Sequence, residues 1–479
     1  MDIKELQKLY AALPQVAQLK KALEDKHKKT IALSGLLSSS APMLFSGLAM
    51  KTGQTILFIM QDDDEAGYFY HDLCQVMGDA RVLFFPSSYR RAIKYGQKDP
   101  ANEILRTEVL TRLMDKSPLY IVTHPSAIAE QVVTRKSLDD RMLSLHVGET
   151  VSVDDTCQML RDFGFHEVDY VYEPGQFALR GSILDVYSYS CEYPFRVDFF
   201  GDDIDSIRTF NVEDQLSRER RDGIDIVPEL TMAEDKESLF KFLPEETILA
   251  AKDFDFVRDS VEKAWQEGFS SQALTERLEN ATEVEEYQIR QEMQRDSQII
   301  SGAQFAHDSE QFRKIMLARG EDFSFNTSPQ PLFHKNFELL AKTFEDYRLR
   351  GYTIYILADS QKQIERLKEI LSSMNNGGQA QGAAPAVTGI NHTLHEGYVD
   401  HDLRVCLFTD HQIFDRFHKY NLKSDKARSG KMALTLKEIQ QFELGDYVVH
   451  VDHGVGKFGG LVRMPISSAS GGFQEMIKI

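Results

Sequence analysis

Apolar and polar residues alternate in blocks over the first 136 residues. Short segments that are apolar throughout, such as 55–60 and 82–85, are separated by amphipathic segments of helical length. Strands that are apolar on both faces and alternate with helices are typical of a parallel sheet covered on both sides. The pattern therefore predicts an α/β domain over 1–136. Its expected strands are 30–33, 55–60, 82–85 and 119–123, and its expected helices are 41–51, 64–77 and 101–114.

The pattern changes between residues 137 and 224, where the apolar segments become shorter and richer in aromatic and β-branched residues. The segment 137–235 contains no lysine, and its eight basic residues are all arginine. Gly181 and Gly201 fall where turns are expected between strands. We predict a small α+β domain inserted into the first domain. Its expected elements are a helix at 154–163 and strands at 167–172, 177–187, 195–200 and 206–210.

After residue 224 the α/β pattern returns in two blocks. Residues 225–325 are expected to complete the first domain, with a strand at 247–251 and long charged helices up to 298. Residues 326–420 are predicted to form a second α/β domain, with helices at 336–350 and 360–374 and strands at 352–357 and 404–408. The low-complexity segment 375–385 is a predicted loop, and 421–438 is a predicted linker.

The last segment, 439–479, alternates apolar and polar residues in the manner of a strand, with Val449, Val451 and Val455 on one face. The sequence ends at Ile479, inside what its pattern predicts to be another strand. A remnant of two or three strands is marginal by itself. We therefore expect this last domain to continue beyond Ile479.

Composition favours protein partners over nucleic acid and membranes. The net charge is −19, whereas binding to a phosphate backbone depends on clustered Lys and Arg. No apolar run approaches the ~20 residues of a membrane-spanning helix, and the N-terminus lacks the apolar core of a signal peptide. The four cysteines are far apart in the sequence, which indicates a reducing compartment. We expect a cytoplasmic protein that does not bind membranes.

A serine-rich turn at 34–42 joins a predicted strand to a predicted helix, which is the position of a phosphate-binding P-loop. A functional P-loop needs glycines for close backbone approach, a lysine for the phosphates and a Ser or Thr hydroxyl for magnesium. The aligned positions hold Gly35, Ser38, Ser40, Ala41 and Pro42. We predict a degenerate loop that binds neither ATP nor magnesium, and an ordinary serine-rich turn is the alternative. No catalytic residue is predicted, and no metal site either, because His450 and Asp452 lack a third ligand nearby.

Three groups of motifs resemble a known family and follow one another in the order found there. The segments 30–60, 85–90 and 120–128 resemble the nucleotide-binding-type domain of UvrB, in the degenerate form it has in bacterial transcription-repair coupling factors. The segments 172–185 and 195–208 resemble domain 2, which UvrB and the coupling factors share. The segment 445–459 resembles the start of the coupling factors' RNA-polymerase-interaction domain. The chain is thus similar to the non-motor, N-terminal region of a coupling factor.

This resemblance implies an adaptor that recruits UvrA to stalled RNA polymerase in transcription-coupled nucleotide excision repair. Domain 137–224 is then expected to bind UvrA through Arg180, Arg196 and Phe200, which match the family's motif positions. Segment 439–479 is expected to start an SH3/Tudor-like β-barrel that binds the RNA polymerase β subunit. The ATP-dependent translocase motor, with its ATP, magnesium and most DNA contacts, would lie beyond Ile479, so this segment is not expected to be an enzyme. The alternative is an ATP-dependent DNA-binding repair protein of the UvrB kind, against which the missing P-loop lysine argues.

The residues themselves support a docking surface and also allow a simpler interpretation. Arg196 and Phe200 share one face of a strand, and arginine beside an aromatic residue is a frequent composition of interface hot spots. A register shift of one residue would exchange Phe199 and Phe200, and the outward residue would then belong to the core. The simpler interpretation is that Arg180 and Arg196 form surface salt bridges, which contribute little to stability. Their candidate partners are Asp185, Asp198 and Asp205.

Overall fold

The computed structural model divides the chain into two compact units, Met1–Asp425 and Lys426–Ile479. The described residues are 3–25, 27–88, 100–115, 117–212, 214–230, 235–268, 299–318, 320, 322–375, 387–420, 445–450, 454–465 and 473–478. Most of the charged helices predicted up to 298, the loop at 375–385 and the linker at 421–438 lie outside these residues. Within them, no helix is long and apolar enough to cross a membrane.

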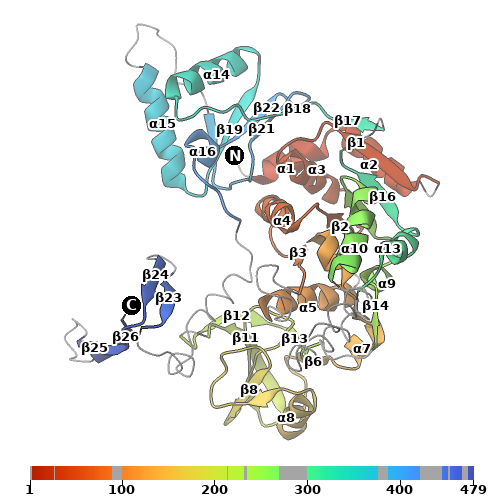
Figure 1. The fold of residues 1–479 in the computed structure, drawn as a ribbon, viewed down its shortest axis with the longest axis vertical. Helices are drawn as coiled ribbons and strands as arrows, with labels where there is room; N and C mark the ends of the chain where they lie inside the picture. Colours follow the sequence, from red (N-terminus) through yellow and green to blue (C-terminus); the bar gives the residue numbers. More distant parts are fainter. Residues whose placement is uncertain are drawn as a thin grey trace. The chain divides into compact units, whose positions relative to one another are not determined.

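A seven-stranded parallel sheet is the largest sheet of the first unit (Figure 1). Its strand order is β17-β1-β16-β15-β2-β4-β3, and all neighbouring strands are parallel. Residues on both sides of the inserted segment therefore build one sheet. Its strands are β1 (Thr30–Ser34), β2 (Ile56–Ile59), β3 (Val82–Phe85), β4 (Tyr120–Thr123), β15 (Ile248–Ala251), β16 (Arg313–Met316) and β17 (Phe323–Ser324).

Both faces of this sheet are buried, as the uniformly apolar strands predicted. Along β2, Ile56 and Phe58 join one hydrophobic core, and Leu57 and Ile59 join the other. The first core is completed by α1 (Ile3–Ala11), α2 (Pro14–Glu24), α3 (Ser40–Ala49) and α4 (Asp63–Met77). The second core is completed by α5 (Pro100–Met114), α6 (Pro125–Ala129), α9 (Leu239–Phe242), α10 (Phe254–Gly268) and α13 (Gly302–Ser309).

The inserted segment forms a six-stranded sheet with a core of its own. Helix α8 (Val153–Asp162) packs on this core through Cys157 and Leu160. The order is β12-β11-β10-β9-β8-β7, and all pairs are antiparallel except β7 with β8. The strands are β7 (His166–Glu167), β8 (Gln176–Arg180), β9 (Ile183–Val186), β10 (Phe195–Phe200), β11 (Asp203–Phe210) and β12 (Ser217–Arg221).

Two strand predictions in this domain are wrong. The segment 177–187 is a hairpin of β8 and β9, in which Gly181 adopts a φ of +63° that glycine tolerates without strain. The segment 167–172 contributes only Glu167 to β7. Its apolar residues Val168 and Val171 pack instead against a small separate cluster around Phe210, so their alternation reflects a loop that packs on the sheet.

Two short antiparallel pairs join the inserted domain to the seven-stranded sheet. β5 (Val132–Val133) pairs with β14 (Lys236–Glu237), and β6 (Leu143–His146) pairs with β13 (Gly223–Ile226). Helix α7 (Arg135–Asp139) lies between β5 and β6 in the sequence. These pairs place the entry and the exit of the inserted domain side by side.

A five-stranded mixed sheet, of order β18-β21-β22-β19-β20, follows in the same unit. One face carries a core with α14 (Phe337–Leu349) and α15 (Gln361–Asn375). The other face contributes Tyr355, Leu357 and Leu407 to the first core of the seven-stranded sheet, so the two sheets share a core. The remaining elements are β18 (Thr327–Pro329), β19 (Thr353–Leu357), β20 (Val387–Ile390), β21 (Tyr398–Asp400), β22 (Val405–Thr409) and α16 (Asp410–Ile413).

The second unit contains two antiparallel strand pairs. β23 (Tyr447–His450) pairs with β24 (Gly454–Lys457), and β25 (Leu461–Pro465) pairs with β26 (Phe473–Ile477). The alternation predicted as one strand from 449 to 455 is therefore a hairpin, whose residues 451–453, Asp452 among them, lie outside the described part.

We expect Gly35→Ala to destabilise the first unit. Gly35 has a φ of +78°, and an added Cβ would lie 1.8 Å from the carbonyl oxygen of Phe325. Since the clash is with backbone, the loop must move, and the melting temperature should fall by several degrees. Gly53→Ala is the matched control, because its Cβ would meet nothing within 4 Å. Equal melting temperatures for the two variants would contradict this account of the loop.

Candidate docking surface and remnant nucleotide loop

The outward face of β10 carries the residues predicted to bind a partner. Phe195, Val197 and Phe199 point into the core of the inserted domain, whereas Arg196 and Phe200 lie on the opposite face. Phe200 is 83% exposed. The register therefore places Phe200, and not Phe199, on the surface, which leaves a large aromatic side chain facing solvent.

Asp185 of β9 holds the two predicted arginines. Its carboxylate accepts hydrogen bonds from Arg196 Nε and Nη2 at 2.7 and 2.8 Å, and a further one from Arg180 Nη2. The side chain of Asp185 is fully buried. The salt-bridge interpretation is thus correct for both arginines, but the bridges differ from the surface pairs expected, because their shared carboxylate is buried.

Arg196 is mostly buried, so it is better placed to position its neighbours than to contact a partner directly. Its Nη1 donates to the carbonyl of Gln215 at 3.0 Å, and its guanidinium lies 4.4 Å from the ring centroid of Phe210. Its side chain is 14% exposed, and hydrogen bonding to Asp185 raises the pKa of Arg196 above its ordinary value. Arg196 therefore anchors the segment around Gln215 onto the sheet.

Arg180 and Phe200 remain available to a partner. The Arg180 side chain is 35% exposed, and its guanidinium lies 4.6 Å from the ring centroid of Tyr170. Tyr170, Tyr172 and Leu216 are exposed as well. Large apolar side chains beside a guanidinium match the composition of interface hot spots, so this face has the chemistry of a protein-docking surface.

The predicted degenerate nucleotide loop, residues 34–42 and called the remnant loop below, connects β1 to α3. Residues of the segment that builds the five-stranded sheet hold it by hydrogen bonds. The amide of Leu37 donates to Thr327 Oγ1 at 3.0 Å, and Thr327 Oγ1 donates to the carbonyl of Gly35 at 2.7 Å. Ser39 Oγ accepts a hydrogen bond from the amide of Glu396 at 2.9 Å. Groups that would face a phosphate in a functional P-loop thus bond to a neighbouring domain.

The residues at the predicted degenerate loop positions lie at the end of β1 and the start of α3. Gly35, Ser38, Ala41 and Pro42 line a cavity of about 580 Å³, whereas Ser40 is fully buried at the start of α3. The charged lining residues of this cavity are Lys252, Glu65, Asp72 and Glu396. Lys252 pairs with Glu65, so no described residue of the lining is an unpaired lysine. Carboxyl groups outnumber lysine among these described residues, which opposes a polyphosphate.

Asp72 is a titratable group that the sequence analysis missed. It accepts a hydrogen bond from the amide of His395 at 2.7 Å, and burial raises the pKa of its carboxyl to about 7. The signal was present in the sequence, because Asp72 shares an apolar helical face with Phe69 and Val76. Beside it, Tyr68 stacks on His395 with 3.6 Å between ring centroids. These contacts make the mouth of the remnant loop an interdomain contact.

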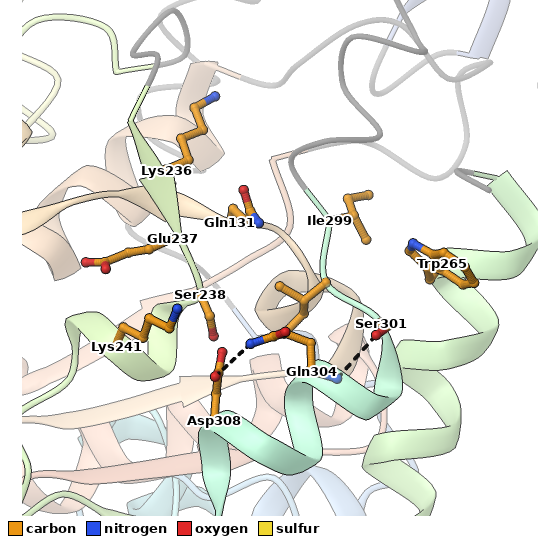
Figure 2. Close-up of a pocket in the computed structure, with 11 residues that line it drawn as sticks. Gln131, Lys236, Glu237, Ser238, Lys241, Trp265, Ile299, Ser301, Gln304 and Asp308 are labelled. Carbon is orange, nitrogen blue, oxygen red and sulfur yellow. Dashed lines mark hydrogen bonds between the residues drawn. The ribbon is translucent and has the colours of Figure 1, made fainter. Parts of the chain in front are cut away.

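A second cavity, of about 380 Å³, lies beside α10 and α13 (Figure 2). Asp308 and Gln304 project from α13, and Gln304 Nε2 donates to Asp308 at 2.8 Å. Trp265, the one tryptophan of the chain, lines it from α10. Lys236 and Lys241 balance the charges of Glu237 and Asp308 in this lining. Balanced charge favours neither an anionic nor a cationic ligand, so the lining indicates no particular chemistry.

We expect Asp72→Asn to remove a pH dependence of stability. The folded-state pKa of about 7 exceeds the unfolded value of 3.8, so the folded chain holds the proton more tightly. The free energy of unfolding of the wild type should therefore fall, relative to that of the variant, by up to about 1.4 kcal/mol per pH unit as pH rises from about 4 to 7. Above pH 7 the difference should be constant. Urea unfolding of both proteins across this range measures it, and parallel curves would contradict the assignment.

Two family models match the chain. The UvrB interaction domain matches residues 143–231, and the CarD-like/TRCF RID domain matches residues 442–479. The first contains the whole six-stranded sheet described above. The second contains the two strand pairs of the second unit.

Curated relatives match almost the whole chain at low identity. The transcription-repair-coupling factor of Bacillus subtilis (strain 168) is 22% identical over 91% of this chain. Those of Staphylococcus aureus (strains bovine RF122 / ET3-1 and Mu50 / ATCC 700699) are 23% identical over the same share. The chain spans 42% of the length of each of these relatives. Two domain matches and a similarity that runs along 91% of its sequence identify the chain as similar to the N-terminal part of the transcription-repair-coupling factors.

Proposed function

We propose that the chain is the adaptor region of a transcription-repair coupling factor, which recruits UvrA to stalled RNA polymerase without hydrolysing ATP in this segment. The observation that carries the proposal is the exposed Phe200, which lies on the same face of the six-stranded sheet as the partly exposed Arg180, opposite to the core. Both lie on a domain that is similar to the UvrB interaction domain. The chemistry of this surface suits a folded protein partner, because a large aromatic side chain and a pre-positioned guanidinium are typical interface anchors.

The second unit is proposed to bind the RNA polymerase β subunit. Its similarity to the CarD-like/TRCF RID domain and its two consecutive antiparallel strand pairs support this role. We propose that these pairs are the start of an SH3/Tudor-like β-barrel, because hairpins that follow one another are the building units of such barrels.

A UvrB-like, ATP-dependent DNA-binding protein is the second candidate. The cavity at the carboxyl ends of β1 and β2 favours it, because open parallel sheets bind ligands there. The loop and the charges around the cavity argue against it. Ala41 and Pro42 replace the lysine and the hydroxyl, and Lys252, the one lysine among the described lining residues, is paired with Glu65. The seven-stranded sheet is therefore proposed to be a P-loop-type sheet that has exchanged nucleotide binding for interdomain packing.

Phe200→Ala is expected to weaken UvrA binding by at least tenfold, because a buried aromatic anchor typically contributes more than ~2 kcal/mol. Calorimetry with purified UvrA from the same organism measures the affinity. Phe417→Ala is the matched control, since Phe417 is 85% exposed and lies outside the inserted domain. Arg196→Ala would be a less specific test, because it would leave the buried Asp185 short of a partner and perturb the fold. Unchanged binding by Phe200→Ala would remove this surface from the proposal.

Magnesium-ATP is expected to leave the melting temperature of this chain unchanged. A ligand that binds only the folded state raises stability with its concentration, and the lining of the 580 Å³ cavity opposes polyphosphate. UvrB under the same conditions serves as the positive control. A rise in melting temperature that Lys252→Ala abolishes would favour the second candidate.

A further inference from the structure

Three arginines form a row across neighbouring strands of the inserted domain. Arg220 of β12 lies opposite Arg208 of β11, and Arg208 lies opposite Arg196 of β10. Arg196 in turn lies opposite Asp185 of β9. Residues directly opposite one another in an antiparallel pair project to the same face. The row therefore belongs to the face that carries Phe200.

Described residues of the domain neutralise the row only in part. Like charges opposite each other in a sheet repel, and the described residues relieve this only in part. Asp185 is shared by Arg180 and Arg196, and Asp198 pairs with Arg208. Arg220 forms no ion pair with any residue that the structure describes, and all residues of β12 are exposed. Positive charge thus exceeds negative charge at the β12 end of this face, in a chain whose net charge is −19.

The other end of the face differs in charge. Asp203 lies opposite Phe200, and its carboxylate accepts a hydrogen bond from Thr150 Oγ1 at 2.5 Å. The two ends of the docking face therefore differ in charge. One end carries an aromatic anchor and a carboxylate, and the other carries the guanidinium of Arg220, which forms no ion pair with a described residue. A face with this polarity distinguishes partners by the position of their charges.

We propose that the partner docked on Phe200 places a cluster of carboxylates against this row, and that Arg220 is a specificity residue of the interface. The inference rests on the proposed function, because it concerns the same surface and the same partner, UvrA. An acidic protein surface is favoured over DNA phosphates because exposed aromatic side chains accompany the arginines. Phe200 shares a face of β10 with Arg196, and Tyr170 lies against Arg180. Phosphate-binding faces are instead dominated by cationic and polar groups.

The roles of Arg220 and Phe200 in the kinetics of binding differ. An exposed charge at the rim acts at long range, so it raises the association rate and makes that rate sensitive to salt. A buried aromatic anchor acts after docking and slows dissociation. Arg220 should therefore govern the association rate constant, and Phe200 the dissociation rate constant.

Surface plasmon resonance with immobilised UvrA separates these effects. Arg220→Glu is expected to lower the association rate constant about tenfold at low ionic strength, and less at high ionic strength. The fold should survive, because the carboxylate introduced by Arg220→Glu would lie opposite Arg208. A melting temperature at or above that of the wild type verifies this.

Arg221→Glu is the matched control. Arg221 is on the same strand and undergoes the same change of charge, but it lies opposite Ile207, whose side chain faces the core of the domain. It should therefore change the association rate constant by less than threefold. Equal effects of Arg220→Glu and Arg221→Glu would overturn the inference, while Phe200→Ala would still report on the proposed function.

Two further outcomes are decisive. If the wild-type chain does not bind UvrA at all, the proposed function and this inference fail together. A short DNA duplex serves as the alternative ligand. If the wild-type chain binds the duplex, and Arg220→Glu loses this binding but still binds UvrA as the wild type does, the row recognises phosphates and the inference is wrong.

Discussion

The parallel pairing of β2 with β15 is the constraint on which the rest of the fold depends. It places residues 56–59 beside 248–251, while β4 pairs with the other edge of β2. The chain after β4 must therefore leave the sheet and return to it before β15. The pairs β5–β14 and β6–β13 repeat this closure farther along the excursion. Because the nested pairs bring entry and exit together, the inserted domain folds around a separate core. A partner can therefore dock on its outer face without disturbing the core of the seven-stranded sheet.

The remnant loop shows how a strand-to-helix turn is held by protein contacts in the place where a P-loop would hold a phosphate. The start of a helix leaves backbone amides that need acceptors, and a bound phosphate would supply them. Here Thr327 Oγ1 supplies an acceptor for the amide of Leu37. The amide of Glu396 donates in the opposite sense, to Ser39 Oγ. Both partners belong to the segment that builds the five-stranded sheet. A buried network behind it, in which Tyr10 bonds to Tyr398 and Asp400, fixes the same two domains. These contacts give the loop a structural role, which agrees with the proposed exchange of nucleotide binding for interdomain packing.

The sequence predicted elements well where one physical signal dominated. Uniformly apolar strands with amphipathic helices specified the parallel sheet, and period-two alternation correctly placed Arg196 and Phe200 on one face of β10. The prediction of strands from alternation failed in two places. Around Val168 an alternating segment is a loop whose apolar residues pack on the sheet, and at Gly181 a turn interrupts an alternating segment. The ion-pair partners of the arginines could not be predicted from the sequence. Asp185 was one of three candidate aspartates for the arginines, and only the register of β9 against β10 selects it. The row that ends at Arg220 likewise needs the pairing of three strands.

Asp185 couples the stability of the inserted domain to its docking surface. Breaking a buried ion pair from one side typically costs about 3–5 kcal/mol, because the remaining charge is left uncompensated. Asp185 and Arg196 are therefore constrained together, whereas the exposed Phe200 and Arg220 can change without loss of the fold. Arg180 lies between these extremes. Held by Asp185 and Tyr170, its guanidinium has lost much of its conformational freedom before a partner arrives, so its ordering on binding opposes association less than that of a mobile side chain. In the proposed interface, the buried carboxylate of Asp185 therefore contributes to recognition indirectly, because it positions the guanidinium of Arg180.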